Sequence, residues 1–411
     1  MAAASEFFNV QPVTVALETV FAHWSPSRRT IGLDVRQGLG RVLAQPVHSP
    51  ENLPAFTRST MDGYAVIAAD TFGASASLPA YLQVVGVVKM GTASSVEVMT
   101  GQAVEIHTGG MLPPGVDAVV MVERTQPLGA GEIEVLAPVA PGENLVQIGE
   151  DVRQGDLILP TGHRLRPQDI GGLLGVGVVQ VEVIEPLRVG ILSCGDELVT
   201  PESGIEPGQI RDINAYTLAG LLAEAGAEPV LLGIARDDLA DFTAKARAGF
   251  AEVDMLIVTA GSSVSARDLT AEVISGLGQP GVLQHGLAVK PGKPTILAVC
   301  ENRPVIGLPG NPVSAMLVAR QIVLPLVRHW FGLSFRPAMV QAVLGRNIAS
   351  TTGREDSVPV RLLEQDGVLT AEPIFGKSNL IYTLVNADGL VTVPLNSGGL
   401  KAGAAVDVVL F

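Results

Sequence analysis

The stretch LRVGILSCG (residues 187–195) is a mostly apolar run that ends at a glycine and predicts a buried strand, and it opens the part of the chain that decides the fold. Similar runs alternate with helix-like segments over residues 187–333. The last of these segments, NPVSAMLVARQIVLPLVRHW, predicts a helix with Asn311 as its N-cap and Pro312 at its first position. Alternating strands and helices are typical of a doubly wound, mostly parallel sheet, which we predict here.

The rest of the chain has a different character. The first fifty residues predict a helix, a turn at Ser25 and Pro26, and a further helix-like segment. A β-rich stretch follows, then mixed loops with a helix that starts at Pro167, and the chain ends in short strands with glycine-rich turns. We therefore expect a multidomain α/β plus β protein with an elongated mixed domain (1–50 and 142–186), an inserted β-rich domain (51–141), an α/β domain (187–333) and a C-terminal β-barrel (334–411).

Composition excludes several classes of protein. The 411 residues exceed what one hydrophobic core usually serves. A formal net charge of −14 argues against nucleic acid as a partner, and the two cysteines and six histidines lack the spacing of a disulfide framework or a zinc site. No run reaches the roughly 18 apolar residues of a membrane helix, and the N-terminus lacks the pattern of a secretory signal. We expect a soluble cytoplasmic protein.

Chemistry-bearing residues follow the predicted strands. In an open parallel sheet, ligands bind beyond the carboxyl ends of the strands. Five strand ends bring acids, hydroxyls, lysines and backbone amides to one edge, at residues 194–197, 236–238, 261–268, 290–293 and 309–312. Glycine and small hydroxyl residues before a helix let backbone N–H groups approach an oxyanion, lysines neutralise phosphate-type charge, and carboxylates suit Mg²⁺. This mixture predicts a polyanionic ligand with magnesium.

Each of these signals also has an ordinary structural interpretation. Asp237 could cap the helix that it precedes, and residues 261–265 could be a simple strand-to-helix turn. The corner at 290–293 could be a solvated turn, and Cys194 is better explained as a small buried residue than as a nucleophile. RSTMDGYAV, which contains Asp62, would pass as a hairpin turn by itself.

Taken together, the motifs resemble one family. The sequences STMDGYAV, HTGGMLPPGVDAVVMVE, GDEL, GQIRDINAYTL, AVKPGKPT and GLPGNPVSAM occur in the order found in the MoeA family of molybdopterin molybdenumtransferases. The E domains of gephyrin and of plant Cnx proteins are similar. The resemblance covers essentially the whole chain, and MDGYAV with LPGNPVSA is its specific pair.

The resemblance implies a fold and an activity. It implies four domains, with a MogA- or MoaB-like α/β domain, in a homodimer whose active site lies between the α/β domain of one subunit and the inserted domain of the other. Such enzymes take adenylylated molybdopterin and molybdate and, with Mg²⁺, release AMP and molybdenum cofactor. We expect a separate molybdopterin adenylyltransferase, which this chain could contact, to supply the substrate.

The resemblance also assigns roles to residues of this chain. It implies catalytic roles for four acids, of which the last three would also bind the metal: Asp62, Glu197, Asp237 and Asp268. The implied substrate-binding residues are Thr108, Gly261, Ser262, Ser263, Lys290, Lys293, Pro309, Gly310, Asn311, Arg361 and Ser378. Asp62 and Thr108 would come from the inserted domain across the dimer.

The chain departs from the family at two places. GSSVSARD replaces the usual GGxSxG loop and keeps only Gly261, and Gly286 stands where some relatives have a further lysine. The altered loop leaves open a non-catalytic pterin-binding or scaffold protein, although a scaffold needs none of the retained acids and lysines. The same reaction with tungstate also stays open, because tungstate and molybdate have nearly the same size and charge.

Overall fold

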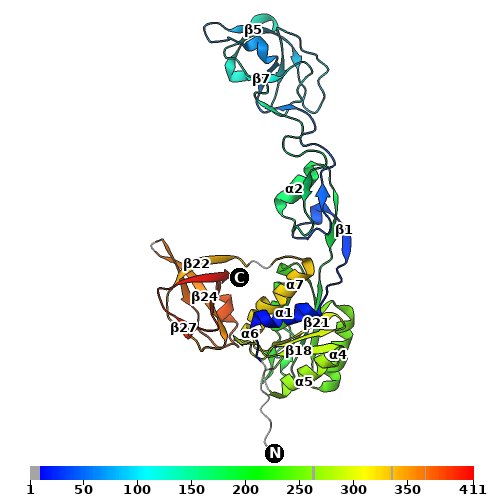
Figure 1. Cartoon of the computed structure of the whole chain (residues 1–411), viewed down its shortest axis with the longest axis vertical. Helices are drawn as coiled ribbons and strands as arrows, with labels where there is room; N and C mark the ends of the chain where they lie inside the picture. Colours follow the sequence, from blue (N-terminus) through cyan, green and yellow to red (C-terminus); the bar gives the residue numbers. More distant parts are fainter. Residues whose placement is uncertain (1–9, 262–263, 335–336, 366) are drawn as a thin grey trace, which may run out of the picture. The chain divides into compact units, whose positions relative to one another are not determined.

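The computed structural model describes residues 10–261, 264–334, 337–365 and 367–411 (Figure 1). The described residues form two compact units. The first unit combines the chain up to Thr30 with Ile184–Phe411, and the second unit is Ile31–Val183. Each is described by itself below.

In the described part of the first unit, a six-stranded sheet forms the centre. Its order is β16 (Glu228–Ala235), β13 (Arg188–Cys194), β17 (Met255–Ala260), β21 (Arg303–Pro309), β20 (Ile296–Cys300) and β18 (Pro280–His285). The first four strands are parallel, as predicted, and β20 runs antiparallel to both its neighbours. The sheet is therefore mixed at one edge.

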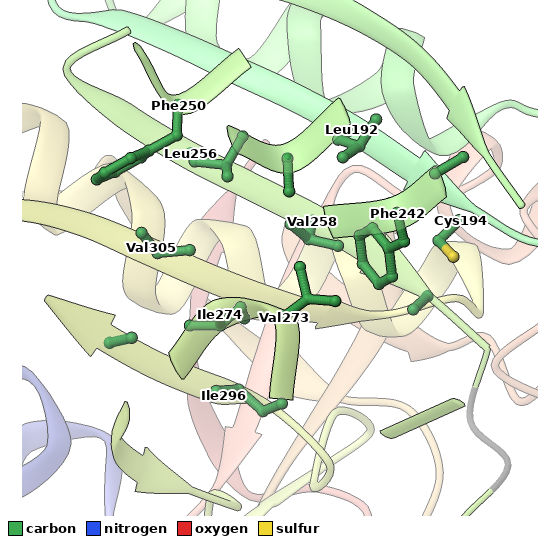
Figure 2. Close-up of a cluster of buried hydrophobic side chains, with 14 of the residues drawn as sticks. Leu192, Cys194, Phe242, Phe250, Leu256, Val258, Val273, Ile274, Ile296 and Val305 are labelled. Atoms are coloured by element: carbon green, nitrogen blue, oxygen red, sulfur yellow. The ribbon is translucent and has the colours of Figure 1, made fainter. Parts of the chain in front are cut away.

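Apolar side chains fix the helices on this sheet. The helices of this region are α3 (Asn214–Glu224), α4 (Leu239–Glu252), α5 (Val264–Ser275), α6 (Pro312–Val318) and α7 (Leu324–Phe331). Figure 2 shows Phe242 and Phe250 from α4 and Val273 from α5 packed against Leu192 and Val258 of the sheet. Burying a side chain of this kind stabilises the fold by about 1.5–3 kcal/mol. As predicted, α6 begins after the N-cap Asn311 with Pro312 in its first turn.

The C-terminal residues close into a small barrel, as the sequence predicted. Hydrogen-bonded pairs run in the order β24 (Glu355–Gln365), β25 (Val368–Pro373), β22 (Met339–Leu344), β28 (Ala405–Leu410) and β26 (Gly389–Val393). The ring closes because β26 also pairs with β24.

One expected strand lies elsewhere. The run before the lysine corner was predicted to belong to the parallel sheet, but β19 (Val289–Lys290) pairs with β24 of the barrel, and Lys290 lies opposite Asp356. The apolar pattern indicates an extended segment without naming its partner, which explains the error. The segment between β18 and β20 therefore links the sheet to the barrel.

The two tryptophans of the chain are both buried in the first unit. Trp330 in α7 donates its indole N–H to the backbone oxygen of Glu185 at 2.8 Å, and Trp24 lies 5.4 Å from the His329 ring. Trp24 directly follows α1 (Val13–His23). These contacts attach the N-terminal helix to the α/β region.

The described part of the second unit contains another six-stranded sheet. Its order is β7 (Ala118–Met121), β4 (Gly63–Val66), β6 (Gln102–Ile106), β5 (Ala80–Val87), β9 (Glu132–Val135) and β8 (Thr125–Leu128). Helix α2 (Pro167–Gly175) starts at the predicted Pro167. Asp169 of this helix accepts hydrogen bonds from the Arg166 backbone N–H and guanidinium and contacts His163 at 2.7 Å.

The helix-like segment predicted after Pro26 is wrong. That stretch forms β1 (Thr30–Asp34) and a single 3₁₀ turn at Val35–Gln37. The segment pairs with β12 (Gln180–Ile184), and this strand pairing outweighs the helix-like pattern of its own residues. Within the described ranges, no helix combines the length and the apolar composition needed to cross a membrane.

Candidate functional site

The carboxyl ends of four parallel strands meet at one edge of the first unit. Cys194 pairs with both Ala235 and Ala260, and Ala260 pairs with Pro309, so the four strands end side by side. Gly310 follows immediately, and a Cβ atom there would lie 2.8 Å from the Ala260 oxygen. The edge predicted from the sequence is therefore formed. The backbone at position 310 comes so close to the Ala260 oxygen that only a glycine fits there.

Two neighbouring strand ends place carboxylates together. The Cys194 thiol donates to Asp237 Oδ1 at 3.4 Å, and the Asp196 backbone N–H lies 3.5 Å from Asp237 Oδ2. Glu197 folds back over Gly195, where an added Cβ would lie 2.7 Å from its Oε2 atom. Asp196 is part of the GDEL motif but was given no role from the sequence, and its backbone N–H contact places it next to Asp237.

The structure rejects the interpretation of Asp237 as a helix cap. Asp238 is the N-cap of α4, and its carboxylate accepts from the N–H groups of Ala240 at 3.1 Å and Asp241 at 3.0 Å. Because Asp238 satisfies the helix start, Asp237 is available for another role.

Cys194 behaves as a buried structural thiol. Burial, followed by the hydrogen bond to Asp237, raises the pKa of Cys194 far above its ordinary value. A thiol that stays protonated is a poor nucleophile. This result agrees with the structural interpretation of Cys194.

The third predicted metal ligand is Asp268. Asp268 is an exposed residue of α5. Gly261 and Pro309 line a small recess at the strand-end edge, whereas Ser262 and Ser263 lie outside the described residues. Among the residues that the structure describes, no three Asp, Glu, His or Cys side chains are grouped as a metal site. The assignment of Glu197, Asp237 and Asp268 to Mg²⁺ stays a prediction.

A cleft of about 840 Å³ adjoins this edge, and we call it the cation cleft. Its lining comes from the lysine corner, the start of α6 and the barrel, and it includes the predicted residues Lys290, Lys293, Pro309, Asn311 and Ser378. Gly310 and Arg361 are absent from the described lining. Arg361 instead donates from Nε to the Asn386 backbone oxygen at 3.3 Å.

The charge of the cation cleft is strongly positive. Its described lining holds four cationic side chains, Lys290, Lys293, Arg354 and Lys377, against one carboxylate, Asp356. Asp356 is almost fully buried, and it pairs with Lys290 at 3.7 Å and with Arg354 at 2.9 Å. In a chain of net charge −14 this excess of cations is a local feature, and it fits a ligand with several negative charges.

Sequence reasoning missed part of this lining. Arg354, Lys377, Thr351 and Thr352 come from loops of the barrel, and the sequence gives no local sign that these loops face the lysine corner. The parallel pairing of β19 with β24 brings Thr351, Thr352 and Arg354 to the cleft, and the hydrogen bond from the Val313 N–H to the Ser378 oxygen brings the turn with Lys377 there.

Asn214 lies in the motif GQIRDINAYTL but was given no role from the sequence. Its Nδ2 donates to the Gly310 oxygen at 2.8 Å, which fixes the orientation of the amide. Its Oδ1 is buried and has no donor among the described residues. Asn214 therefore holds the 309–311 loop in place.

In the second unit, Asp62 and Thr108 are brought together. Asp62 Oδ1 accepts from the Thr108 backbone N–H at 2.7 Å and from its hydroxyl at 3.0 Å, and these bonds hold the pKa of Asp62 below its ordinary value. The pairing of Gly63 with Ile106 explains the proximity, since Asp62 precedes one strand and Thr108 follows the other.

The hairpin interpretation of RSTMDGYAV is wrong. Strand β3 (Arg58–Ser59) pairs with β10 (Leu145–Val146), whereas β4 pairs with β6 and β7. The turn at Asp62 thus connects strands of different sheets.

Comparisons with known proteins cover almost the whole chain. Three family models match, described as the MoeA N-terminal region (domain I and II) at residues 11–177, a probable molybdopterin binding domain at 190–329, and the MoeA C-terminal region (domain IV) at 341–411. A putative molybdopterin biosynthesis protein of Methanocaldococcus jannaschii is 34% identical over 98% of both chains. A molybdopterin molybdenumtransferase of Haemophilus influenzae is 33% identical over 92% of both chains.

Solved structures agree with these matches. Two crystal structures of the molybdopterin biosynthesis MoeA protein from Pyrococcus horikoshii superpose with TM-scores of 0.84 and 0.85 at 36% and 30% identity. They cover 98% of this chain and 99% and 100% of the solved chains. The similarity confirms the predicted multidomain α/β plus β class over the full length.

Proposed function

The chain belongs to the MoeA family, and from this we propose that it inserts molybdate into adenylylated molybdopterin and releases AMP with the help of Mg²⁺. Curated relatives at 33% and 32% identity carry the name molybdopterin molybdenumtransferase. A separate molybdopterin adenylyltransferase as the source of the substrate is part of the same proposal.

The observation that carries the proposal is the charge of the cation cleft. Molybdate is a tetrahedral dianion, and adenylylated molybdopterin carries phosphate groups. Both ligands need cations and hydroxyl donors, which the cleft supplies through its lysines, Arg354 and Ser378. A volume of about 840 Å³ is within the range of sites that hold ligands of this size.

The carboxylates at the strand ends fit a magnesium ion that is completed by substrate. Mg²⁺ usually takes one or two carboxylates and fills its shell with water and substrate phosphates. Asp237 and Glu197 offer such a partial set. Mg²⁺ would supply charge neutralisation at the phosphate linkage. Hydrolysis of that linkage forms a bond from a water oxygen to phosphorus as the P–O bond breaks, and the water protons go to the two phosphate products, one of which is AMP. Asp237 would keep its carboxylate directed at that position, because Asp196 and Cys194 donate to it.

The dimer is part of the proposal as well. Family membership supports a homodimer in which Asp62 and Thr108 serve the active site of the other subunit. The hydrogen bonds from Thr108 keep Asp62 ionised, as a group that orients a metal or a nucleophile must be.

The decisive experiment measures AMP release. Purified chain is mixed with adenylylated molybdopterin and Mg²⁺, together with molybdate, with tungstate, or with neither. Molybdate-dependent AMP release with formation of active cofactor is expected. Release with tungstate alone would keep the reaction and change the metal, and tight substrate binding without release under any oxyanion would contradict the enzyme.

Two variants test the site assignment in the same assay. Asp62→Ala and Asp237→Ala should abolish AMP release while the dimer stays folded by circular dichroism and gel filtration. Asp407→Ala, in an exposed position of β28, serves as the control and should release AMP like the wild type. Wild-type turnover in both test variants would show that the site assignment is wrong.

A further inference from the structure

The turn at residues 375–378, between β25 and α8 (Tyr382–Val385), brings a lysine into the cation cleft from the barrel side. We propose that Lys377 determines the affinity of the cleft for a tetrahedral oxyanion, either molybdate or a phosphate group of the substrate. The identity of the oxyanion rests on the proposed function, whereas the placement of Lys377 rests on the contacts described next.

The first argument is the distribution of charge in the cleft. Lys290 and Arg354 both contact the buried carboxylate of Asp356, which offsets part of their positive charge. Lys377 is exposed, and within the described part of the chain no carboxylate pairs with its ammonium group. No protein carboxylate therefore competes with an incoming anion for the ammonium group of Lys377 within the described residues.

The second argument is the rigidity of the turn. The Val313 N–H donates to the Ser378 oxygen at 3.0 Å, and the Ile374 N–H donates to the Pro359 oxygen at 2.8 Å. The first bond ties the turn to α6 and the second ties it to β24. The backbone on both sides of Lys377 is thus tied to the walls of the cleft, so anion binding would not have to order this turn.

Gly376 shows how closely this turn is packed. A Cβ atom at Gly376 would lie 2.3 Å from the Thr383 Cγ2 atom of α8. The Leu380 N–H also donates to the Lys377 oxygen at 3.0 Å, so the next residues fold back over the turn. The position of Lys377 is therefore set by packing and hydrogen bonds on both sides.

The third argument is that hydroxyl side chains line the cleft together with Lys377. Ser378, Thr351 and Thr352 line the same cleft and provide hydroxyl groups. The oxygens of a tetrahedral oxyanion need several donors, and a cation combined with hydroxyl groups supplies them. Lys377 therefore gives the anion a contact from the barrel in addition to the lysine corner next to the sheet.

The test compares Lys377→Gln with Lys401→Gln in the full-length chain. Lys401 is an exposed lysine of the same barrel and does not belong to the described lining of the cleft. Calorimetric titration with inorganic molybdate, tungstate and AMP at low salt measures each Kd. Lys377→Gln should raise the Kd by about tenfold, the loss expected for one charge-assisted contact, while Lys401→Gln leaves it unchanged. Lys377→Arg should restore most of the affinity, and thermal melts should match the wild type.

The three probes identify the source of the oxyanion. A loss confined to molybdate and tungstate assigns Lys377 to the metal oxyanion, and a loss confined to AMP assigns it to a substrate phosphate; a loss for all three supports shared use. Equal Kd values in wild type and Lys377→Gln, or no binding by either, would overturn the inference. Binding that depends on Lys377 without any AMP release would instead overturn the proposed function alone.

Discussion

At the scale of single residues, two hydrogen bonds from Thr108 control the charge of Asp62. We predict that Thr108→Val raises the pKa of Asp62 part of the way toward its ordinary value of 3.8, because the hydroxyl bond is lost and the stronger backbone bond remains. Since the folded pKa lies below 3.8, the stabilising effect of ionised Asp62 is present above that value and is lost as the pH falls through the folded pKa. Carboxyl NMR titration measures the change in the pKa of Asp62.

Thr92→Val, which removes a hydroxyl bond to Lys89, is the control. An equal shift of the Asp62 pKa in both variants would contradict the assignment.

At the scale of elements, Gly292 keeps the lysine corner against α6. Its φ is +111°, and a Cβ atom there would lie 2.2 Å from the Val318 Cγ2 atom. Gly292→Ala should therefore lower the free energy of unfolding by about 2–4 kcal/mol through strain and overpacking, as measured by urea denaturation. Gly353 is the matched control, because its φ is +91° but a Cβ would meet nothing within 4 Å. A loss of the same size at Gly353 would show that backbone strain alone is responsible.

Helix α2 gives a second prediction at this scale. Asp169 is almost fully buried, and its bonds to Arg166 and His163 hold its pKa far below the ordinary value. Asp169→Asn should destabilise the second unit by about 1–3 kcal/mol at neutral pH, detected as faster amide hydrogen exchange in α2. Because the folded pKa is lowered, this stabilisation is present above pH 3.8 and disappears as the pH falls toward the folded value. Asp34→Asn removes an exposed pair with Arg36 and should change exchange far less.

The elements also show what a sequence can predict. The helix that begins after Asn311 and Pro312 was predicted because its start signals are local. The segment that forms β1 and the run that forms β19 were assigned wrongly because distant strands determine their pairing. Asp237 was ambiguous for a related reason, since only the structure shows that Asp238 caps α4. Local signals thus predict where an element begins, and tertiary pairing decides its neighbours.

At the scale of the whole molecule, the candidate site depends on one strand pair. Lys290 of β19 lies opposite Asp356 of β24, so the lysine corner and the barrel wall are held together by backbone pairing. Family resemblance predicts Lys290, Lys293 and Ser378 but assigns no role to Lys377. The structure adds Lys377, because it lies in the same turn as Ser378 and lines the same cleft.

Net charge gives a prediction at this scale. The chain carries −14 overall, but the cation cleft acts on an anion at short range, within the Debye length of about 8 Å at physiological salt. Raising KCl from about 0.05 M to about 0.5 M should therefore raise the Kd for molybdate several-fold, because salt screens the nearby cations. Calorimetry measures the dependence. A Kd that falls with salt would mean that repulsion by the whole chain dominates, and replacing KCl with sucrose of matched osmolality controls for effects other than ionic strength.

Because Trp24 and Trp330 are both buried in the first unit, tryptophan fluorescence can be used to follow that unit. These are its two tryptophans, so emission excited selectively from tryptophan reports on the unit that carries the cation cleft, whereas Tyr64 and Tyr81 belong to the unit that carries Asp62. The chain also has two cysteines, Cys194 and Cys300, and both are buried. A cysteine introduced on the surface of the second unit would therefore take a thiol-reactive fluorophore selectively, and the two colours would follow the two units in one titration.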